Sequence, residues 1–178
     1  LRIGDTVPAP RLAVCRTPQW PAAQPETVAL FEDLPGRLAR AGAYVGRLEL
    51  PAPFAGLEAA QGIIWEYEMA RNLADEFHRH AVRIREPLRG QLAAGWSIPP
   101  ERYDAAKALA RDCRRQLADV FATFDALIVP AAPGEAPAGL AATGNPVFNR
   151  IWTLLHVPAV TVPWSTGPNG LPLGLQVI

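Results

Sequence analysis

Chemically reactive side chains are scarce in this sequence. Ser97 and Ser165 are its only serines, and Lys107 is its only lysine. The two cysteines, Cys15 and Cys113, lie far apart and outside any paired motif, which argues against a disulfide framework and against a zinc site. We therefore expect reduced, packed cysteines, no metal and no cofactor.

Net charge and long apolar runs are also missing. Lys plus Arg and Asp plus Glu both number 17, so the chain has no basic field to hold a nucleic acid backbone. No apolar run approaches the roughly 18 to 20 residues that a membrane-spanning helix needs, and residues 1–7 lack the layout of a signal peptide. The sequence predicts a cytoplasmic protein with neither a nucleic acid nor a membrane partner.

Proline and glycine, by contrast, are frequent. The 178 residues include 19 prolines and 14 glycines, which predicts many sharp reversals between short buried elements and disfavours a helical bundle. The chain begins inside an apparent loop and stops on the apolar run 173–178. We therefore expect residues 1–178 to be one portion of a domain, incomplete at both ends.

Hydrophobic periodicity divides the chain into strands and helices. Short apolar runs bounded by proline or turn residues, which suit strands, occur at 11–16, 44–50, 125–130, 159–164 and 173–178. Apolar residues at helical spacing occur at 25–41, 54–80, 99–124 and 147–155. The expected fold is α/β, with an open mixed central sheet flanked by helices.

Several residues mark the ends of these elements. Gly42 is placed to end the helix over 25–41, and Ser97 is available to cap the helix over 99–124. Asn145 followed by Pro146 supplies a cap and a first-turn proline for the helix over 147–155. Asn-Gly at 169–170 predicts a tight turn between the last two strands.

No catalytic group emerges from the residues alone. A serine nucleophile needs an adjacent base and an oxyanion hole, whereas Ser97 suits a helix cap and Ser165 a turn. Neither serine lies in a Gly-x-Ser-x-Gly elbow. Lys107 falls off the apolar face of its helix, so we expect it in solvent. A hydrolase that combines Lys107 with Ser97 or Ser165 stays open as a remote alternative.

Two other groups on the helix over 54–80 have simple explanations. His78 and His80 are two residues apart, so on a helix they point in different directions and do not bind one metal ion together. Glu68 lies near the apolar stripe, where a structural hydrogen bond is favoured over a substrate contact because buried carboxylates are usually paired.

The stretch over 129–153 is the most informative. It follows the carboxyl end of a buried strand, where open α/β sheets place their ligand sites, and it ends at a helix N-terminus. Two interpretations stay open: the loop walls a pocket, or its glycines and prolines only route the chain.

Four stretches closely resemble the C-terminal half of amidase signature enzymes. They are DALIVPAAPGEAP at 125–137, TGNPVFNRIWTLL at 143–155, VPAVTVP at 157–163 and GLPLGLQVI at 170–178. The earlier elements also fit the middle of such an enzyme, so the resemblance covers essentially the whole chain. It implies a mixed central sheet layered with helices, as part of the amidase signature fold.

The resemblance implies hydrolysis of a carboxamide through an acyl-enzyme on serine. The family carries its lysine, bridging serine and nucleophilic serine with a Gly-Ser-rich segment, and no Gly-Gly-Ser or Ser-Ser string occurs here. We therefore expect the catalytic Ser-Ser-Lys set to lie in a missing N-terminal half and this chain alone to be inactive. Its role would be a pocket wall and sheet scaffold in an enzyme that takes a small-molecule amide.

The family pattern also points to residues of the acyl pocket. The substrate-binding residues predicted in this way are Ala131, Ala132, Pro133, Thr143, Asn149, Trp152 and Thr153. Two positions depart from the pattern: His156 stands where glycine is common, and Asn145 stands where aspartate is common. We expect His156 to narrow the helix exit and Asn145 to keep its capping ability.

A different class of function stays open beside the amide hydrolase. The chain would then be a non-catalytic interaction or assembly module that kept the pocket wall and lost the chemistry. A fragment should also end its sheet on strands that are open to new partners and should expose apolar area. These features predict self-association, so a homo-oligomer is among the expected partners.

Overall fold

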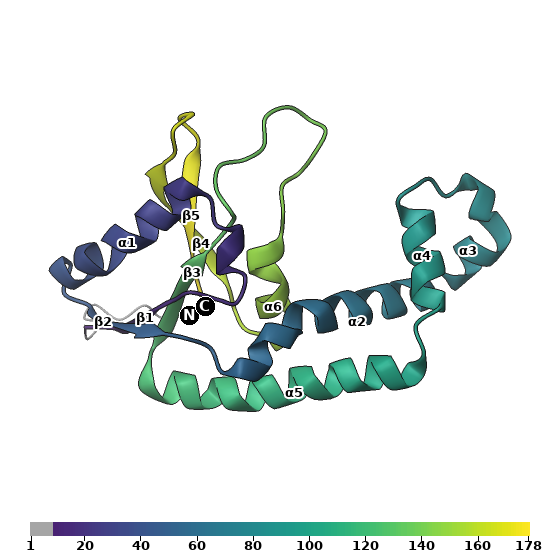
Figure 1. Cartoon of the computed structure of the whole chain (residues 1–178), viewed down its shortest axis with the longest axis horizontal. Coiled ribbons are helices and arrows are strands. Elements are labelled where there is room, and N and C mark those ends of the chain that lie inside the picture. The colour runs from purple at the N-terminus through teal and green to yellow at the C-terminus, as the bar shows by residue number, and fades with distance from the viewer. Residues whose placement is uncertain (1–8) are drawn as a thin grey trace, which may run out of the picture.

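A five-stranded sheet flanked by helices forms the centre of the computed structural model, which describes residues 9–178 (Figure 1). In chain order the strands are β1 (Arg11–Cys15), β2 (Tyr44–Leu48), β3 (Ala126–Pro130), β4 (Val160–Thr166) and β5 (Pro172–Val177). They lie in the order β2-β1-β3-β5-β4. β1 pairs in parallel with β2 and β3, whereas β5 pairs antiparallel with β3 and β4. The mixed sheet and the five predicted strands are confirmed.

The described residues also form six α-helices. They are α1 (Pro25–Arg40), α2 (Leu57–Asn72), α3 (Ala74–His80), α4 (Leu88–Trp96), α5 (Pro100–Thr123) and α6 (Val147–Leu155). Single 3₁₀ turns lie at η1 (Trp20–Ala22), η2 (Ala52–Gly56) and η3 (Ala81–Arg83). In the part of the chain that the structure describes, no helix is long and apolar enough to cross a bilayer.

Different helices cover the two faces of the sheet, and alternate residues of β1 show the division. Ala13 and Cys15 are fully buried in a cluster formed with α2, α5 and α6. Val14, between them, belongs to the opposite cluster with Phe31 and Leu34 of α1. The period of two along a strand sends neighbouring side chains to opposite faces, so both faces of β1 are buried.

The predicted single helix over 54–80 is wrong. The structure divides this stretch into η2, α2 and α3, with a break at Leu73, whose φ and ψ are −104° and 28°. The cause lies in packing, because α3 buries no residue and so offers no apolar face to continue the stripe of α2. The end of α2 is instead covered by α4, a helix that periodicity did not predict.

Two of the four predictions about helix ends and turns are confirmed: Gly42 ends α1 with φ +95°, and Gly170 has φ +82° in the β4–β5 turn. Asn145 Oδ1 accepts a hydrogen bond of 3.1 Å from the Val147 N–H. Pro146 holds the N-cap position, however, so Asn145 lies one residue before the cap. Ser97 does not cap α5. Its hydroxyl donates to the Ala93 carbonyl at 3.1 Å, so it belongs to the end of α4.

Candidate functional site

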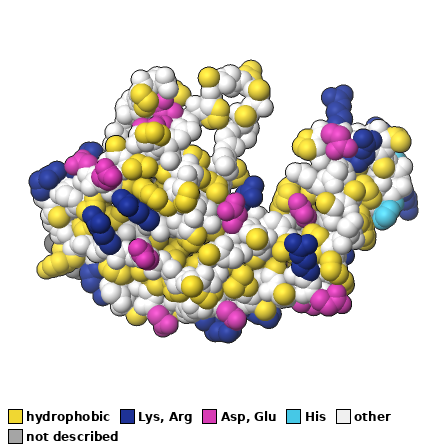
Figure 2. Space-filling model, in the orientation of Figure 1, with side chains coloured by type: hydrophobic (Ala, Val, Ile, Leu, Met, Phe, Trp, Pro, Cys, Tyr) yellow, Lys and Arg dark blue, Asp and Glu magenta, His cyan; other side chains and the backbone are white. Residues whose placement is uncertain are grey.

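A cavity of about 860 Å³ opens at the carboxyl end of β3. Its walls are the loop 131–146, the first turn of α6, Ala22 and Gln24 in and after η1, and the β4–β5 hairpin. The loop and the hairpin project from the same side of the sheet in Figure 1 and form two neighbouring projections in the space-filling view of Figure 2. The position agrees with the place where open α/β sheets bind ligands.

Asn149 fixes the start of the loop to the sheet and to α6. Its Nδ2 donates to the Ala131 carbonyl at 3.0 Å, and its Oδ1 accepts a hydrogen bond of 2.7 Å from Gln176 Nε2 on β5. A further bond of 2.7 Å runs from the Gln24 N–H to the Pro133 carbonyl. The loop therefore leaves β3 in a position that side-chain and backbone hydrogen bonds define.

Gly174 of β5 lines the cavity at a position where its neighbours leave no room for a side chain. A Cβ at this position would lie 2.8 Å from Thr161 Cγ2 and 3.3 Å from the Ala131 Cβ. Thr161, Ala131 and Gly174 all line the cavity. Glycine here lets the hairpin approach the loop closely, so the floor of the cavity is tightly packed.

Glu135 joins the loop to the turn of the hairpin. Its carboxylate accepts hydrogen bonds from the Asn169 N–H at 3.0 Å, from Asn169 Nδ2 at 2.7 Å and from the Leu171 N–H at 2.9 Å. Burial raises the pKa of this carboxyl, but the three donors lower it by more, so the pKa of Glu135 lies below its ordinary value. The group is therefore ionised at neutral pH.

Five of the seven predicted substrate-binding residues line this cavity. They are Ala131, Ala132, Pro133, Thr143 and Asn149. Their role in binding a substrate stays a prediction.

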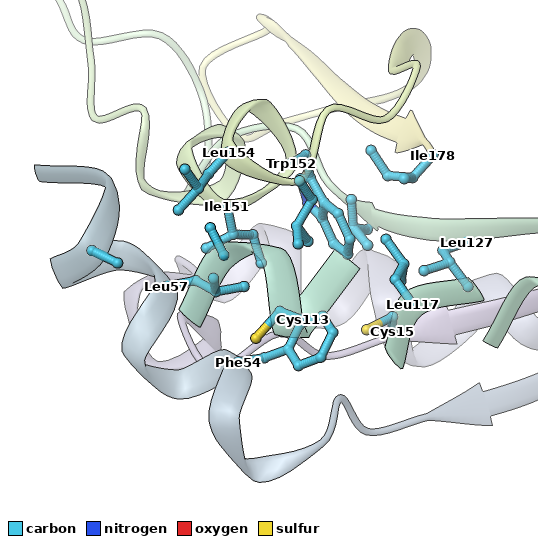
Figure 3. Packing of buried hydrophobic residues seen from close by; sticks show 14 of the residues in the cluster. Cys15, Phe54, Leu57, Cys113, Leu117, Leu127, Ile151, Trp152, Leu154 and Ile178 are labelled. Atoms are coloured by element: carbon cyan, nitrogen blue, oxygen red, sulfur yellow. The ribbon is translucent and has the colours of Figure 1, made fainter. Parts of the chain in front are cut away.

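Trp152 and Thr153 lie away from the cavity. Trp152 is only 1% exposed and packs in the core, near Ile151, Leu127 and Ile178 (Figure 3). Thr153 is exposed and donates its hydroxyl hydrogen bond to the Asn149 carbonyl at 3.2 Å. α6 therefore presents Asn149 to the cavity, whereas Trp152 faces the core and Thr153 faces solvent.

Glu135 and Gly174 are two of the lining residues that sequence reasoning missed. Glu135 is the only charged residue in 131–146, so its isolation in an apolar loop was a usable signal. Gly174 carried no comparable signal, because its closeness to Ala131 depends on the pairing of β5 with both β3 and β4.

The serines and the lysine are not brought together. Ser97 bonds within α4, and Ser165 lies exposed on β4. Lys107 Nζ lies 3.7 Å from Glu68 Oε1 on α2, and the same carboxylate accepts a 2.8 Å hydrogen bond from the Tyr103 hydroxyl. Glu68 makes the expected hydrogen bond, but its side chain is exposed and not buried. The arrangement gives no support to a nucleophile activated by Lys107.

His78 and the two cysteines pack against neighbouring side chains and form no metal site among the described residues. His78 lies against Phe77 and Trp96, with ring centroids 5.6 and 5.1 Å apart. Cys15 and Cys113 are free and buried, and burial raises the pKa of the Cys15 thiol to about 12. Across residues 9–178, no three His, Cys, Asp or Glu side chains gather where they could hold a metal ion.

The amidase family model matches residues 6–178. The chain belongs to the amidase family. 2-Amino-5-chloromuconic acid deaminase of Comamonas testosteroni is 26% identical to it over 195 residues, which cover 98% of this chain and 42% of the deaminase. A glutamyl-tRNA(Gln) amidotransferase subunit of Granulibacter bethesdensis is 37% identical over 98 residues, covering 49% of this chain and 18% of the amidotransferase polypeptide.

Solved amidase structures share the fold. An amidase crystal structure superposes with a TM-score of 0.83 at 23% identity, covering 96% of this amidase chain and 42% of the other. The structure of 6-aminohexanoate cyclic dimer hydrolase complexed with substrate gives a TM-score of 0.77 at 16% identity, with coverages of 97% and 42%. This amidase chain therefore spans less than half the length of these relatives.

Proposed function

We propose that this chain supplies one wall of the binding cleft and part of the central sheet of an amide hydrolase. Such an enzyme converts a carboxamide and water into a carboxylate and ammonia or an amine. The observation that carries the proposal is the cavity at the end of β3, which gathers five residues predicted to line an amide pocket in a chain of the amidase family.

The chemistry of the lining favours a small, neutral amide. Ala131, Ala132 and Pro133 offer small apolar surfaces. Asn149 binds Ala131 and Gln176 with one N–H and one lone pair, which leaves its second N–H and second lone pair for a ligand. The carboxylate of Glu135 is already occupied by hydrogen bonds from the hairpin. A planar carboxamide suits such a wall better than a charged ligand, because an unpaired charge is costly to bury.

We place the catalytic Ser-Ser-Lys set outside this chain. The separation of Ser97, Ser165 and Lys107 supports this assignment, because nucleophilic catalysis requires the hydroxyl and its base within hydrogen-bond reach. The remaining polypeptide of the amidase domain would supply those groups and the opposite wall. Two buried, free thiols suit a reducing compartment, and we propose the cytoplasm.

The free edge of β4 is the place where we expect that polypeptide to bind. Among residues 9–178, β4 is an edge strand, and its Val160 and Val162 side chains are 62% and 39% exposed. An exposed apolar edge strand pairs readily with another chain. In the absence of the remaining polypeptide, a second copy of this chain would bind to the same edge and form a homo-oligomer.

A titration with benzamide tests the binding half of the proposal. Amide resonances of Ala131, Ala132, Thr143 and Asn149 should shift on addition of benzamide in ¹⁵N-correlated NMR spectra. Thr143→Trp should weaken the binding because it fills the cavity, whereas Ala142→Trp next to it, outside the lining, should leave binding unchanged. Unperturbed lining residues at saturating benzamide would contradict the proposal and favour the interaction module, which the exposed β4 edge also supports.

An assay of ammonia release tests where catalysis lies. We expect no release above background when this chain is incubated with benzamide or acetamide. Hydrolysis that disappears in Ser97→Ala or Ser165→Ala would overturn the assignment of the nucleophile to polypeptide outside the chain.

A further inference from the structure

Every hydrogen bond between the hairpin tip and the loop 131–146 ends on one carboxylate. For the described residues 9–178, the donors on the tip 167–171 that reach this loop are the Asn169 N–H, Asn169 Nδ2 and the Leu171 N–H, and all three bind Glu135. The remaining bonds of the tip are internal, from Gly167 to Leu171 at 2.8 Å and from Gly170 to Gly167 at 3.1 Å. The tip is thus a compact turn that is attached to the loop by Glu135.

The two segments joined in this way form facing walls of the cavity. Glu135 belongs to the lining of the loop side, and Pro172, directly after the hairpin tip, belongs to the lining of the hairpin side. Thr161 and Pro163 of β4 continue the hairpin wall. The separation of the walls therefore depends on where the hairpin tip sits against Glu135.

We infer that Glu135 is a positioning residue that holds the β4–β5 hairpin against the loop 131–146, sets the width of the cavity and so limits the size of the ligand it admits. The limit on ligand size rests on the proposed function, since it assumes that an amide occupies the cavity. The other part of the inference, that Glu135 holds the hairpin in place, does not depend on the proposed function.

The close packing around Glu135 supports a specific contact between this side chain and the hairpin. A Cβ at Gly167 would meet the side chain of Glu135 at 2.5 Å, so the hairpin tip sits against the carboxylate, which would have to shift to admit a larger residue. On the other side, the Glu135 N–H donates to Glu26 Oε1 of α1 at 3.5 Å. The loop therefore contacts α1 through its backbone and the hairpin through its side chain.

The contact depends on the ionised form of the carboxyl. An ionised carboxylate accepts hydrogen bonds on both oxygens, whereas a protonated one places a donor on one of them, which would then face the donor Asn169 Nδ2. The hairpin tip 167–171 and the loop 131–146 contain no other titratable residue. The charged groups that face this region come from α1, namely Glu26, Asp33 and Arg37.

Amide hydrogen exchange measured by NMR tests the positioning role. Relative to the parent chain, Glu135→Ala should lower the protection factors of the Asn169 and Leu171 amides by at least about tenfold, because charge-assisted hydrogen bonds are among the stronger ones. Glu135→Gln, which keeps one acceptor oxygen, should retain part of the protection. Glu32→Gln, an exposed glutamate of α1, is the matched control and should retain all of it.

The pH profile separates this role from general structural support. In the parent chain, protection at Asn169 and Leu171 should fall as the pH drops below the ordinary glutamate pKa of 4.5, while in Glu135→Gln it should no longer follow pH in that range. Circular dichroism of each variant reports whether the fold is kept. Unchanged protection at both amides in a folded Glu135→Ala variant would overturn the inference.

Ligand size provides the second measurement. Parent chain and Glu135→Ala are titrated with acetamide and with the bulkier N-benzylbenzamide, and the variant should lose discrimination against the bulkier amide. Equal discrimination in both chains would overturn the assigned limit on size. Binding of neither amide would contradict the proposed function and the size limit together, while the exchange measurement would still decide the holding of the hairpin.

Discussion

Asn149 Nδ2 donates a 3.0 Å hydrogen bond to the Ala131 carbonyl, which ties the first turn of α6 to the first residue after β3. The two residues are 18 positions apart and enclose the loop that forms most of the cavity wall. The bond therefore closes the loop at its base, and Gln176 holds Asn149 in place by donating to its Oδ1 at 2.7 Å.

Asn149→Asp should loosen the closure of the loop 131–146. The substitution replaces the donor Nδ2 by an acceptor that faces the Ala131 carbonyl, so the bond is lost and two oxygens repel each other. We expect the free energy of unfolding to fall by about 1–3 kcal/mol, the usual cost of leaving a partly buried polar group unsatisfied. Urea denaturation followed by tryptophan fluorescence measures the change.

Asn145→Asp is the matched control for this substitution. The Asn145 side chain accepts a hydrogen bond from the Val147 N–H at the start of α6, and an aspartate oxygen accepts the same bond and is favourable near a helix N-terminus. We expect its stability to stay within about 0.5 kcal/mol of the parent. Equal losses in both variants would mean that the bond to Ala131 does not hold the loop.

His156→Gly should stabilise the chain. His156 ends α6 in the left-handed region, with φ 58° and ψ 39°, where a side chain is strained and glycine is not. The residue is exposed, so little packing is lost, and we expect a gain of up to about 1 kcal/mol. His156→Ala should show no such gain, because alanine keeps the Cβ, and thermal denaturation compares the two variants.

The sequence predicted the elements whose signals are local. α6 was predicted with its observed bounds because Asn145 and Pro146 mark its start and because apolar residues recur along it. The same periodicity did not reveal that Trp152 faces the core while Asn149 faces the cavity, since both lie on adjoining parts of one helix surface. That distinction is set by the position of α6 against β3 and β5.

Features created by contacts distant in sequence were missed for the same reason. Glu135 meets Asn169 only because the β4–β5 hairpin folds back beside the loop 131–146. α4 has a weak apolar pattern, and its position is fixed by the contact of Gly95 with α2. Neither contact leaves a periodic signal in the chain.

Gly95→Ala should disrupt the packing of α4 on α2. A Cβ at Gly95 would collide with the Glu66 carbonyl oxygen and lie 2.8 Å from the Ala70 Cβ. Both are on α2, and a backbone oxygen does not move aside as a flexible side chain does. We expect a loss of about 1–3 kcal/mol in the free energy of unfolding, as for other overpacked positions.

Gly62→Ala serves as the control for this helix pair. Gly62 lies within α2 and has nothing within 4 Å of its ideal Cβ, so alanine should stabilise the helix by about 0.5–1 kcal/mol. Urea denaturation of both variants should therefore give changes of opposite sign. A neutral Gly95→Ala would contradict the close approach of α4 and α2.

Asp125 gives the chain a pH-dependent contribution at the start of β3. Hydrogen bonds from the Arg11 side chain and the Arg11 N–H lower the pKa of Asp125 below its ordinary value of 3.8, with Arg11 Nη2 2.7 Å from Asp125 Oδ1. Because the folded pKa is the lower one, the contribution is present above 3.8 and is lost as the pH falls through the folded value. Asp125→Asn should therefore be less stable than the parent at about pH 6, and the difference should shrink toward about pH 2 in urea denaturation at each pH. A difference that does not change with pH would show that the ionised Asp125 does not stabilise the pairing of β1 with β3.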